Sequence, residues 1–210
     1  MKKINIKGVI VTDADKELYE WYEMENTAPM DIAKALEDAN GEDIEVVINS
    51  GGGYINAGTE IYSALENYQG EVNIRILWAG SAASVIAMAR HSVMEPTALI
   101  MIHNVSGAAQ GDYRDMAHES EVLRTASIAM STAYQRKTGL TEKEVLKLMD
   151  EETWLDSKKA LELGFVDEIA QAQKPLVAAA LGVLTEKELK QARQGIAKAK
   201  AQARLEGLRR

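Results

Sequence analysis

The sequence predicts an α/β domain built on a largely parallel sheet, because short apolar runs rich in β-branched residues alternate with segments of helical periodicity. The expected strands lie at residues 4–11, 44–49, 72–78 and 98–102, with a short final strand at 165–169. The helical segments between them lie at residues 28–40, 57–68 and 84–89. Strands that alternate with helices at this spacing favour βαβ units, whose strands pair in parallel.

The second half of the chain is predicted to be mainly helical. A long helix is expected from about Tyr113 to Thr138, and Gly139 ends it. Thr141 and Glu144 have the spacing of a capping box and open the next helix. A further short helix is expected at residues 157–163.

The pair Lys174-Pro175 is the expected boundary between a main domain, residues 1–173, and a C-terminal tail, residues 174–210. The tail is rich in Ala, Lys and Arg, and we expect it to be helical. Residues 186–210 hold eight Lys or Arg against three Glu, a net charge of +5. Its thin apolar stripe favours a solvated helix, and the alternative is a docking arm for an acidic partner.

The composition excludes several classes of protein. The chain has 210 residues and no cysteine, so disulfides, thiolate metal sites and a cysteine nucleophile are excluded. Its formal net charge of -8 argues against nucleic-acid binding. No apolar run approaches the roughly 18 residues of a membrane span, and the first residues lead into no apolar secretion signal. We therefore expect a cytoplasmic protein that binds neither nucleic acid nor membrane.

Three glycines, Gly51 to Gly53, follow the buried strand at 44–49. Because they lack a Cβ, their backbone N–H groups can face an anion or a developing oxyanion, although a tight strand-to-helix turn is the simpler interpretation. Phosphate binding is weakly supported. A dinucleotide fingerprint would need glycine where Asn56 stands, and a P-loop would need Gly-Lys-Ser/Thr where Gly58-Thr59-Glu60 stands.

Ser84 lies in the segment Gly80-Ser81-Ala82-Ala83-Ser84-Val85, where the strand at 72–78 turns into a helix. We expect its hydroxyl at the N-terminus of that helix, where the helix dipole favours the alkoxide that forms as a serine attacks. The pattern differs from the Gly-x-Ser-x-Gly elbow of the α/β-hydrolases. For a lone serine, a helix N-cap would be the simpler interpretation.

His103 closes the strand at 98–102. Sites in parallel sheets gather at the carboxyl ends of strands, and the glycine run, Ser84 and His103 each lie just past such an end. This convergence predicts a serine nucleophile with a histidine base. The acidic residues that could orient the histidine lie in one later segment: Asp150, Glu151, Glu152 and Asp156.

At these residues the chain resembles the Clp protease proteolytic subunit family, over roughly residues 44–167. The similar segments are, in chain order, residues 48–53, 80–84, 101–103 and 160–167. One departure is Gly51, which stands where the family has a proline. The resemblance implies an α/β fold of the Clp protease and crotonase type, with repeated ββα units, a largely parallel sheet and a long protruding helix, here the helix from Tyr113.

The resemblance also assigns roles to individual positions. Ser84 would be the nucleophile and His103 the general base, and the backbone N–H groups of Gly53 and Val85 would form the oxyanion hole. The implied reaction is acyl transfer at a peptide carbonyl, followed by hydrolysis of the acyl-enzyme. The peptidase step needs no metal and no cofactor.

The third catalytic residue is placed by counting back from Trp154, which stands where the family has Phe. This count places the orienting acid on Glu152, where the family usually has Asp. Glutamate is one methylene longer, so its carboxylate must fold back to reach the imidazole. Asp150 is the alternative.

The resemblance implies partners as well. The family forms homo-oligomeric rings, often stacked, that cleave protein or peptide substrates, and its members can work with an ATP-driven AAA+ unfoldase. Residues 6–10 and 151–154 resemble the bacteriophage and prophage branch, which is thought to trim scaffold and capsid proteins during head maturation. On that view the partner would be a capsid or scaffold protein, and the basic tail could bind the scaffold.

Two rival functions remain. A crotonase-type acyl-CoA enzyme shares the fold and an oxyanion hole of paired amides, but it would not need Ser84 and His103 together. A catalytically silent subunit that serves assembly is the second rival. The retained Ser84 and His103 argue against it, whereas glutamate at position 152 weighs slightly for it.

Overall fold

The computed structural model describes residues 1–171 and, in the tail, Lys190, Arg193, Gln194 and Ile196. The chain divides into two compact units, Met1–Gln171 and Ala172–Arg210. The predicted boundary at residues 173–174, and almost all of the helix predicted in the tail, lie outside the described residues. The four described tail residues are helical.

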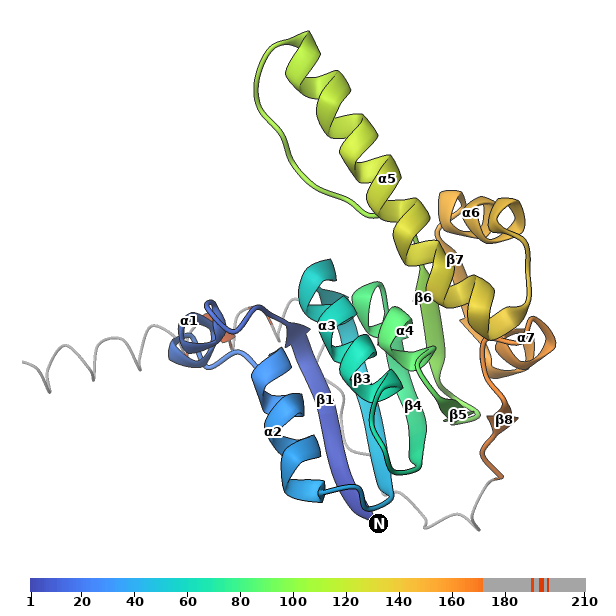
Figure 1. The fold of residues 1–210 in the computed structure, drawn as a ribbon. Helices are drawn as coiled ribbons and strands as arrows, with labels where there is room; N and C mark the ends of the chain where they lie inside the picture. The colour runs from blue at the N-terminus through green and yellow to red at the C-terminus, as the bar shows by residue number, and fades with distance from the viewer. Residues whose placement is uncertain (172–189, 191–192, 195, 197–210) are drawn as a thin grey trace, which may run out of the picture. The chain divides into compact units, whose positions relative to one another are not determined.

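Met1–Gln171 is built on one mixed sheet with a parallel core (Figure 1). Its described strands are β1 (Lys2–Ile10), β2 (Asn26–Thr27), β3 (Ile44–Gly53), β4 (Val72–Gly80), β5 (His91–Met94), β6 (Leu99–Ile102), β7 (Thr153–Asp156) and β8 (Glu168–Ile169). They follow the order β2-β1-β3-β4-β5-β8, and β6 joins the carboxyl end of β4. Each of these pairs is parallel; β6 and β7 form an antiparallel pair. The predicted α/β class with a mostly parallel sheet is confirmed.

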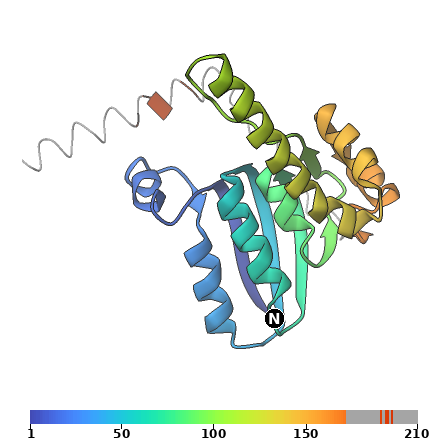
Figure 2. The same cartoon turned by 45° about the horizontal axis from the view of Figure 1, so that its top comes forward.

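The described helices of this unit are α1 (Lys16–Trp21), α2 (Pro29–Ala39), α3 (Ile55–Glu66), α4 (Ala82–Ala87), α5 (Tyr113–Thr138), α6 (Glu142–Asp150) and α7 (Ser157–Glu162). Helices α2, α3 and α4 lie next to one another on one face of the sheet (Figures 1 and 2). The core between these layers is mainly aliphatic, and Ile6, Ile48, Ile74 and Ile86 are all fully buried. Burial of each such side chain stabilises the fold by about 1.5–3 kcal/mol.

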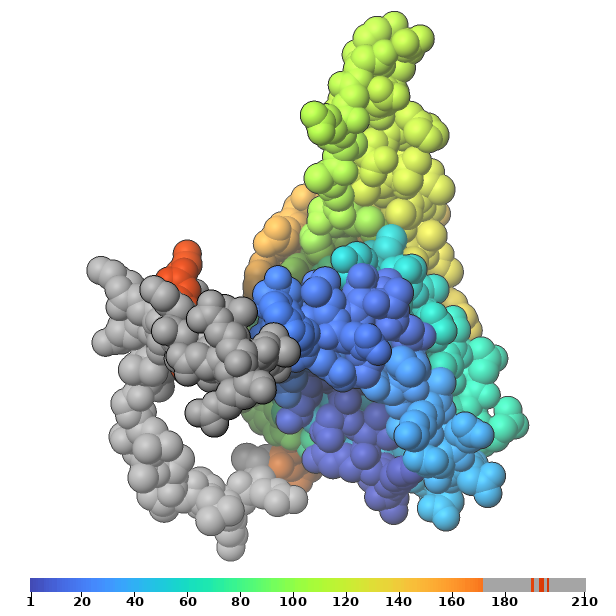
Figure 3. Space-filling view, turned by 90° about the vertical axis from the view of Figure 1, so that its left-hand side faces the viewer, coloured from blue at the N-terminus to red at the C-terminus, as the bar shows by residue number. Residues whose placement is uncertain are grey.

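Helix α5 has the bounds that the sequence predicts, because both of its ends carry strong signals. The Asp112 carboxylate accepts the backbone N–H groups of Arg114 and Asp115 at the start, and Gly139 adopts a left-handed conformation, with φ of 75°, at the end. The C-terminal half of α5 packs onto the core. The N-terminal half projects away from the sheet, and Tyr113 at its start is 82% exposed (Figures 1 and 3).

Several boundaries differ from the sequence expectation, and three of the differences lie near the carboxyl edge of the sheet. Strand β3 continues through the glycines to Gly53, and β4 continues through Ala79 to Gly80. Helix α4 begins at Ala82 rather than at Ser84. Small residues lack the apolar signal of a buried strand, yet they pair in the sheet as well as their neighbours do. The turn between β4 and α4 therefore falls earlier in the chain than expected.

Candidate active site

The carboxyl ends of β4 and β6 meet at one edge of the sheet. The two strands pair in parallel with Gly80 opposite Met101. The residue after Gly80, Ser81, donates its backbone N–H to the carbonyl oxygen of Met101 at 2.9 Å. His103 follows the last residue of β6, so the pairing brings Ser81 and His103 together, as expected of sites at the ends of parallel strands.

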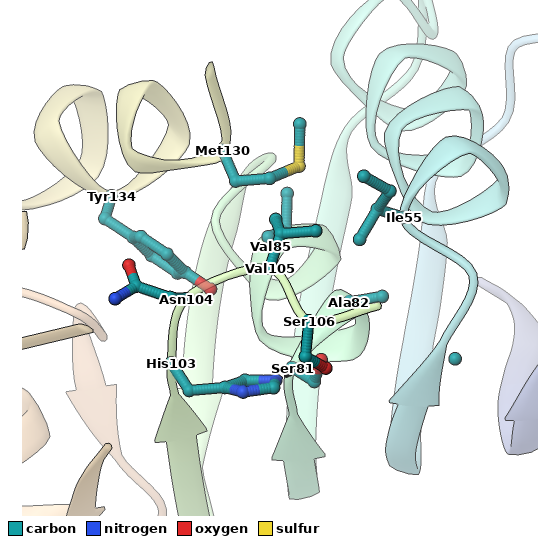
Figure 4. A pocket seen from close by; sticks show the side chains of 11 residues that line it. Ile55, Ser81, Ala82, Val85, His103, Asn104, Val105, Ser106, Met130 and Tyr134 are labelled. Carbon is teal, nitrogen blue, oxygen red and sulfur yellow. Dashed lines mark hydrogen bonds between the residues drawn. The ribbon is translucent and has the colours of Figure 1, made fainter. Parts of the chain in front are cut away.

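His103 faces Ser81 across a short gap (Figure 4). Its Nε2 lies 2.8 Å from the Ser81 Oγ. A neutral imidazole nitrogen at this distance can accept the hydroxyl proton, and this arrangement activates a serine as a nucleophile. His103 thus lies where the sequence analysis expected a general base. Its partner, however, is not the serine that the sequence analysis chose.

Ser81 occupies a strained turn between β4 and α4. Its backbone angles are φ 50° and ψ −123°, a sparsely populated conformation for a residue with a side chain, which costs on the order of 1–3 kcal/mol. Its carbonyl oxygen accepts the backbone N–H groups of Ser84 at 2.9 Å and Val85 at 3.4 Å. A sharp strand-to-helix turn of this kind presents a serine hydroxyl at the end of a strand.

Ser84 does not reach His103. It is fully buried, and its Oγ donates to the carbonyl oxygen of Ser81 at 2.6 Å and lies 2.7 Å from the Tyr134 hydroxyl. Because α4 begins at Ala82, Ser84 lies inside the first turn of the helix instead of at its start. Ser81 therefore takes the position beside the histidine that the sequence analysis gave to Ser84.

The glycine run packs directly against the Ser81 turn. A Cβ on Gly52 would lie 2.7 Å from both the Gly80 carbonyl oxygen and the Ser81 Cβ, and Gly52 has φ of 103°. A Cβ on Gly53 would lie 2.0 Å from the carbonyl oxygen of Ile10. Both contacts are far inside van der Waals distance, so only glycine permits this approach of β3 to β1 and to the Ser81 turn.

The backbone donors around Ser81 differ in part from the predicted pair. Gly53 lines the hollow at Ser81, as expected. The Val85 N–H, by contrast, is directed to the Ser81 carbonyl oxygen within the turn. Ala82, the residue after Ser81, lines the same hollow, and its backbone nitrogen lies close to Gly52. Gly53 and Ala82 thus line the hollow at Ser81 from two different elements, β3 and α4.

Glu152 directly precedes β7, next to the end of the β6–β7 pair. The last pair of the antiparallel register is Ile102 with Thr153, so His103 and Glu152 each lie one residue beyond the paired segment. Glu152 has a left-handed backbone, with φ of 47°. Its Oε1 accepts the indole N–H of Trp154 at 3.3 Å.

Asp150, the alternative acid, accepts a hydrogen bond from the Asn104 side chain at 2.7 Å. Neither the Asp150 nor the Glu152 carboxylate hydrogen-bonds to His103 in the part of the chain that the structure describes. The Glu152 carboxylate would have to leave the Trp154 indole to reach the imidazole.

Two hollows adjoin at this edge of the sheet. The first, of about 60 Å³, is open at the Ser81 Oγ and is also bordered by Ile55, Ser106 and Met130 (Figure 4). The second, of about 420 Å³, lies between α5 and α6 and shares Asn104 and Val105 with the first. Its further walls are apolar at Leu123, Ile128 and Leu146 and polar at Arg124, Ser127 and Asp150.

The other histidines lie away from this edge. His91 begins β5, is exposed, and its Nε2 lies 3.5 Å from Glu168 Oε1. His118 is exposed on α5. Among the described residues, no three His, Cys, Asp or Glu side chains are grouped so that they could hold a metal ion. No helix within the described ranges combines the length and apolarity needed to cross a bilayer.

Sequence reasoning missed Ser81 and Tyr134. The motif Ser-Ala-Ala-Ser contains two serines three residues apart, and the choice between them depends on where β4 ends. Pairing of Ala79 and Gly80 with β6, which sets that end, leaves no apolar signal in the sequence. Tyr134 lies 50 residues from Ser84 on a different helix, so no local pattern connects the two.

The model of the Clp protease family matches residues 24–173, and the chain therefore belongs to the Clp protease family. The match covers the strand ends that carry Ser81 and His103 and the segment that carries Glu152. The resemblance predicted from the sequence is confirmed at the level of the family. The chain thus carries the domain of a Clp-type peptidase, which favours hydrolysis over the acyl-CoA chemistry of a crotonase.

Proposed function

We propose that the protein is a serine endopeptidase in which Ser81 is the nucleophile and His103 the general base. The observation that carries the proposal is the 2.8 Å contact between the Ser81 Oγ and His103 Nε2 on a strained strand-to-helix turn. Strained backbone conformations are frequent at catalytic turns. The chain belongs to the Clp protease family, so the reaction that we propose for this turn is peptide hydrolysis.

In the proposed reaction, His103 Nε2 takes the Ser81 hydroxyl proton while Oγ bonds to the carbonyl carbon of a peptide. The resulting oxyanion would accept hydrogen bonds from the backbone N–H groups of Gly53 and Ala82, each worth about 3 kcal/mol in related sites. His103 then gives the proton to the leaving amine, and the acyl-enzyme forms. Water, deprotonated by His103, hydrolyses this ester and restores Ser81.

Glu152 is the proposed orienting acid. The β6–β7 register supports it, because His103 and Glu152 each lie one residue beyond the last pair, Ile102 with Thr153. In the proposed site, a change of rotamer brings the Glu152 carboxylate from the Trp154 indole to the imidazole Nδ1. Its carboxylate would then stabilise the imidazolium that forms when His103 accepts the proton.

The second hollow supports a preference for an apolar residue in the substrate. A peptide whose carbonyl lies at Ser81 would direct the neighbouring side chain between α5 and α6, against Leu123, Ile128 and Leu146. Arg124 and Asp150 at the margin would contact the polar backbone or a flanking residue. A panel of fluorogenic peptides checks this preference, and faster cleavage after charged residues than after Leu or Met would contradict it.

Activity measurements with the purified full chain test the peptidase proposal. Hydrolysis of a fluorogenic peptide and labelling by a fluorophosphonate probe are expected in the wild type and should be lost in Ser81→Ala and in His103→Ala. Ser131→Ala is the matched control, because Ser131 is fully buried on α5 and bonds only within that helix. Retained hydrolysis in Ser81→Ala would contradict the assignment.

A homo-oligomeric ring is the proposed assembly. The projecting half of α5 supports this, because it carries Tyr113, Met116 and Val122 on an exposed surface. Substitution Met116→Glu should shift the protein toward smaller species in light scattering after size exclusion. A wild type that is monomeric and active would contradict the ring.

Maturation of a bacteriophage or prophage head is the proposed biological role, with a capsid or scaffold protein as substrate. The resemblance of residues 6–10 and 151–154 to that branch and the basic segment 186–210 support this role. Replacement of the eight Lys and Arg of that segment by Gln should slow scaffold cleavage on co-expression while small-peptide hydrolysis stays unchanged. Scaffold cleavage that instead requires an AAA+ unfoldase would favour the alternative role of a general Clp proteolytic subunit.

A further inference from the structure

Ser84 and Tyr134 form a pair of buried hydroxyl groups directly behind the Ser81 turn. Ser84 is 0% exposed and Tyr134 is 2% exposed. The Ser84 Oγ lies 2.6 Å from the carbonyl oxygen of Ser81 and 2.7 Å from the Tyr134 hydroxyl oxygen. We call these two side chains the Ser84–Tyr134 hydroxyl pair.

The direction of the hydrogen bonds in this pair follows from the number of protons. The Ser81 carbonyl oxygen can only accept, so the single hydroxyl proton of Ser84 is donated to it. Tyr134 must then be the donor in the contact between the two hydroxyls. A chain of hydrogen bonds therefore runs from Tyr134 on α5, through Ser84 on α4, to the backbone of Ser81.

The Tyr134 hydroxyl keeps its proton under ordinary conditions. Complete burial raises the pKa of Tyr134 well above its ordinary value, and the hydrogen bond with Ser84 acts in the opposite direction. The Tyr134 ring also packs on the Phe165 ring, with centroids 5.8 Å apart. The Tyr134 hydroxyl, the first donor in this series of hydrogen bonds, is thus neutral, and the packing of its ring on Phe165 fixes its position.

The Ser81 carbonyl oxygen, which accepts the last hydrogen bond of this series, belongs to a residue with a strained backbone. The ψ angle of Ser81 sets the direction of its carbonyl, and its value of −123°, together with φ of 50°, is unfavourable for serine. A strained conformation persists only where its surroundings over-determine it. Three donors converge on this oxygen: the Ser84 N–H, the Val85 N–H and the Ser84 hydroxyl. The hydroxyl makes the shortest of the three contacts.

We propose that the Ser84–Tyr134 hydroxyl pair is a positioning device that holds the Ser81 backbone in its strained conformation and ties it to α5. This inference rests on the proposed function of Ser81 as nucleophile. Ser84 acts through the Ser81 carbonyl, and Tyr134, which also lines the first hollow, acts through Ser84. Loss of the pair lets the Ser81 turn relax and moves the Oγ away from the 2.8 Å contact with His103.

Five full-chain variants test the proposal: Ser84→Ala, Tyr134→Phe, the double variant of these two, Ser81→Ala, and the control Ser131→Ala. The readouts are kcat and KM for a fluorogenic peptide, the rate constant of fluorophosphonate labelling, and the melting temperature. Tyr134→Phe removes a single oxygen and retains the ring packing, so it serves even if Ser84→Ala fails to fold.

Ser84→Ala should lower kcat and the labelling rate constant about tenfold, with KM within about twofold, because substrate contacts are unchanged. Tyr134→Phe should lower kcat about threefold, since Ser84 still donates to the Ser81 carbonyl. The double variant should match Ser84→Ala, because Tyr134 acts only through Ser84. Ser131→Ala loses a buried hydroxyl of the same helix and should lower the melting temperature without a change in kcat.

Three results would overturn the proposal. If Ser84→Ala and Tyr134→Phe lower the melting temperature but leave kcat and labelling at the wild-type level, the pair only packs, and the peptidase assignment stands. If Ser84→Ala abolishes labelling while Ser81→Ala retains it, Ser84 is itself the nucleophile. If the assembled wild type neither labels nor hydrolyses peptide, the proposed function fails and the inference fails with it.

Discussion

The serine–histidine half and the acid half of the candidate site are built in different ways. Ser81 and His103 follow adjacent parallel strands of the buried sheet, and their side chains are already in contact at 2.8 Å. Glu152 precedes β7, which pairs antiparallel with β6 beside the solvent, and its carboxylate bonds to the half-exposed Trp154. The pairing of core strands thus fixes the positions of Ser81 and His103. The position of the Glu152 carboxylate, by contrast, depends on the rotamer of a surface side chain.

Both halves nevertheless share one property. Ser81 and Glu152 are two of the four residues other than glycine that have positive φ among the described residues, with φ of 50° and 47°. Each half therefore contains one strained backbone position next to the chemistry proposed for it. Backbone strain is therefore common to both halves and does not distinguish them. The contact between Ser81 and His103 does, because only this half already has its side chains in hydrogen-bond contact.

The largest effect on activity is expected from Gly52→Ala, which disturbs the serine–histidine half of the site. The new Cβ would lie 2.7 Å from the Gly80 carbonyl oxygen and from the Ser81 Cβ, so the Ser81 turn must move. A shift of about 1 Å at a catalytic group costs about 10²-fold in rate, and kcat/KM should fall at least that far. Peptide hydrolysis and labelling measure the loss.

Gly41→Ala is the matched control for that variant. Gly41 also has positive φ, of 83°, but nothing lies within 4 Å of a Cβ built on it. It should cost only the strain of a left-handed alanine, about 1–2 kcal/mol of unfolding free energy, with kcat/KM unchanged. Equal activity losses in Gly41→Ala and Gly52→Ala would contradict the role given to the glycine run.

The acid half is tested by Glu152→Gln with Asp150→Asn beside it. Glu152→Gln keeps the shape but removes the charge that would stabilise the imidazolium, so kcat/KM should fall between about 10² and 10⁴-fold. Asp150→Asn alters one exposed hydrogen bond, to Asn104, and should change kcat/KM by less than about fivefold. The reverse ranking would make Asp150 the orienting acid.

The smallest effect is expected from Asp167→Asn, which removes an ion pair between Asp167 and Lys137 on α5. Asp167 accepts hydrogen bonds from Lys137 on α5 and from the backbone N–H of Ser92 on β5. Burial alone would raise the pKa of Asp167, but these hydrogen bonds outweigh it and hold the pKa below its ordinary value. Asp167→Asn should therefore lower the melting temperature modestly at pH 7 and leave peptide hydrolysis intact.

The pH dependence of that difference follows from its sign. A carboxylate whose pKa is depressed by folding stabilises the protein above its unfolded pKa, about 3.9, and loses this contribution as the pH falls through the folded value. The gap in melting temperature between wild type and Asp167→Asn should thus narrow as the pH drops below about 4. Thermal melts at pH 7 and pH 3 measure it, and an undiminished gap would contradict the ion-pair explanation.

The sequence predicts much of the fold and only part of the site, for physical reasons. Helix α5 is predicted with its observed bounds because Asp112 and Gly139 carry local signals at its two ends. His103 is predicted because apolar residues run up to it and the strand ends there. Thr141 and Glu144 form the predicted capping box, with the Thr141 hydroxyl and N–H both bonded to the Glu144 carboxylate.

The choice between Ser81 and Ser84 could not be made in the same way. It depends on two small residues, Ala79 and Gly80, that extend β4 by pairing with β6 and so move the turn. Such a pairing is a tertiary contact without a local pattern. The link from Ser84 to Tyr134 is likewise tertiary, because helix periodicity indicates only that Tyr134 belongs to α5 and not what it contacts.

The most direct test of the account is the site of covalent labelling. The wild-type protein is treated with a fluorophosphonate probe, digested, and the labelled peptide is sequenced by tandem mass spectrometry, which separates Ser81 from Ser84 because two alanines lie between them. The account predicts adduct on Ser81, none on Ser84, and no adduct in His103→Ala. Adduct on Ser84 in an otherwise native protein would contradict it.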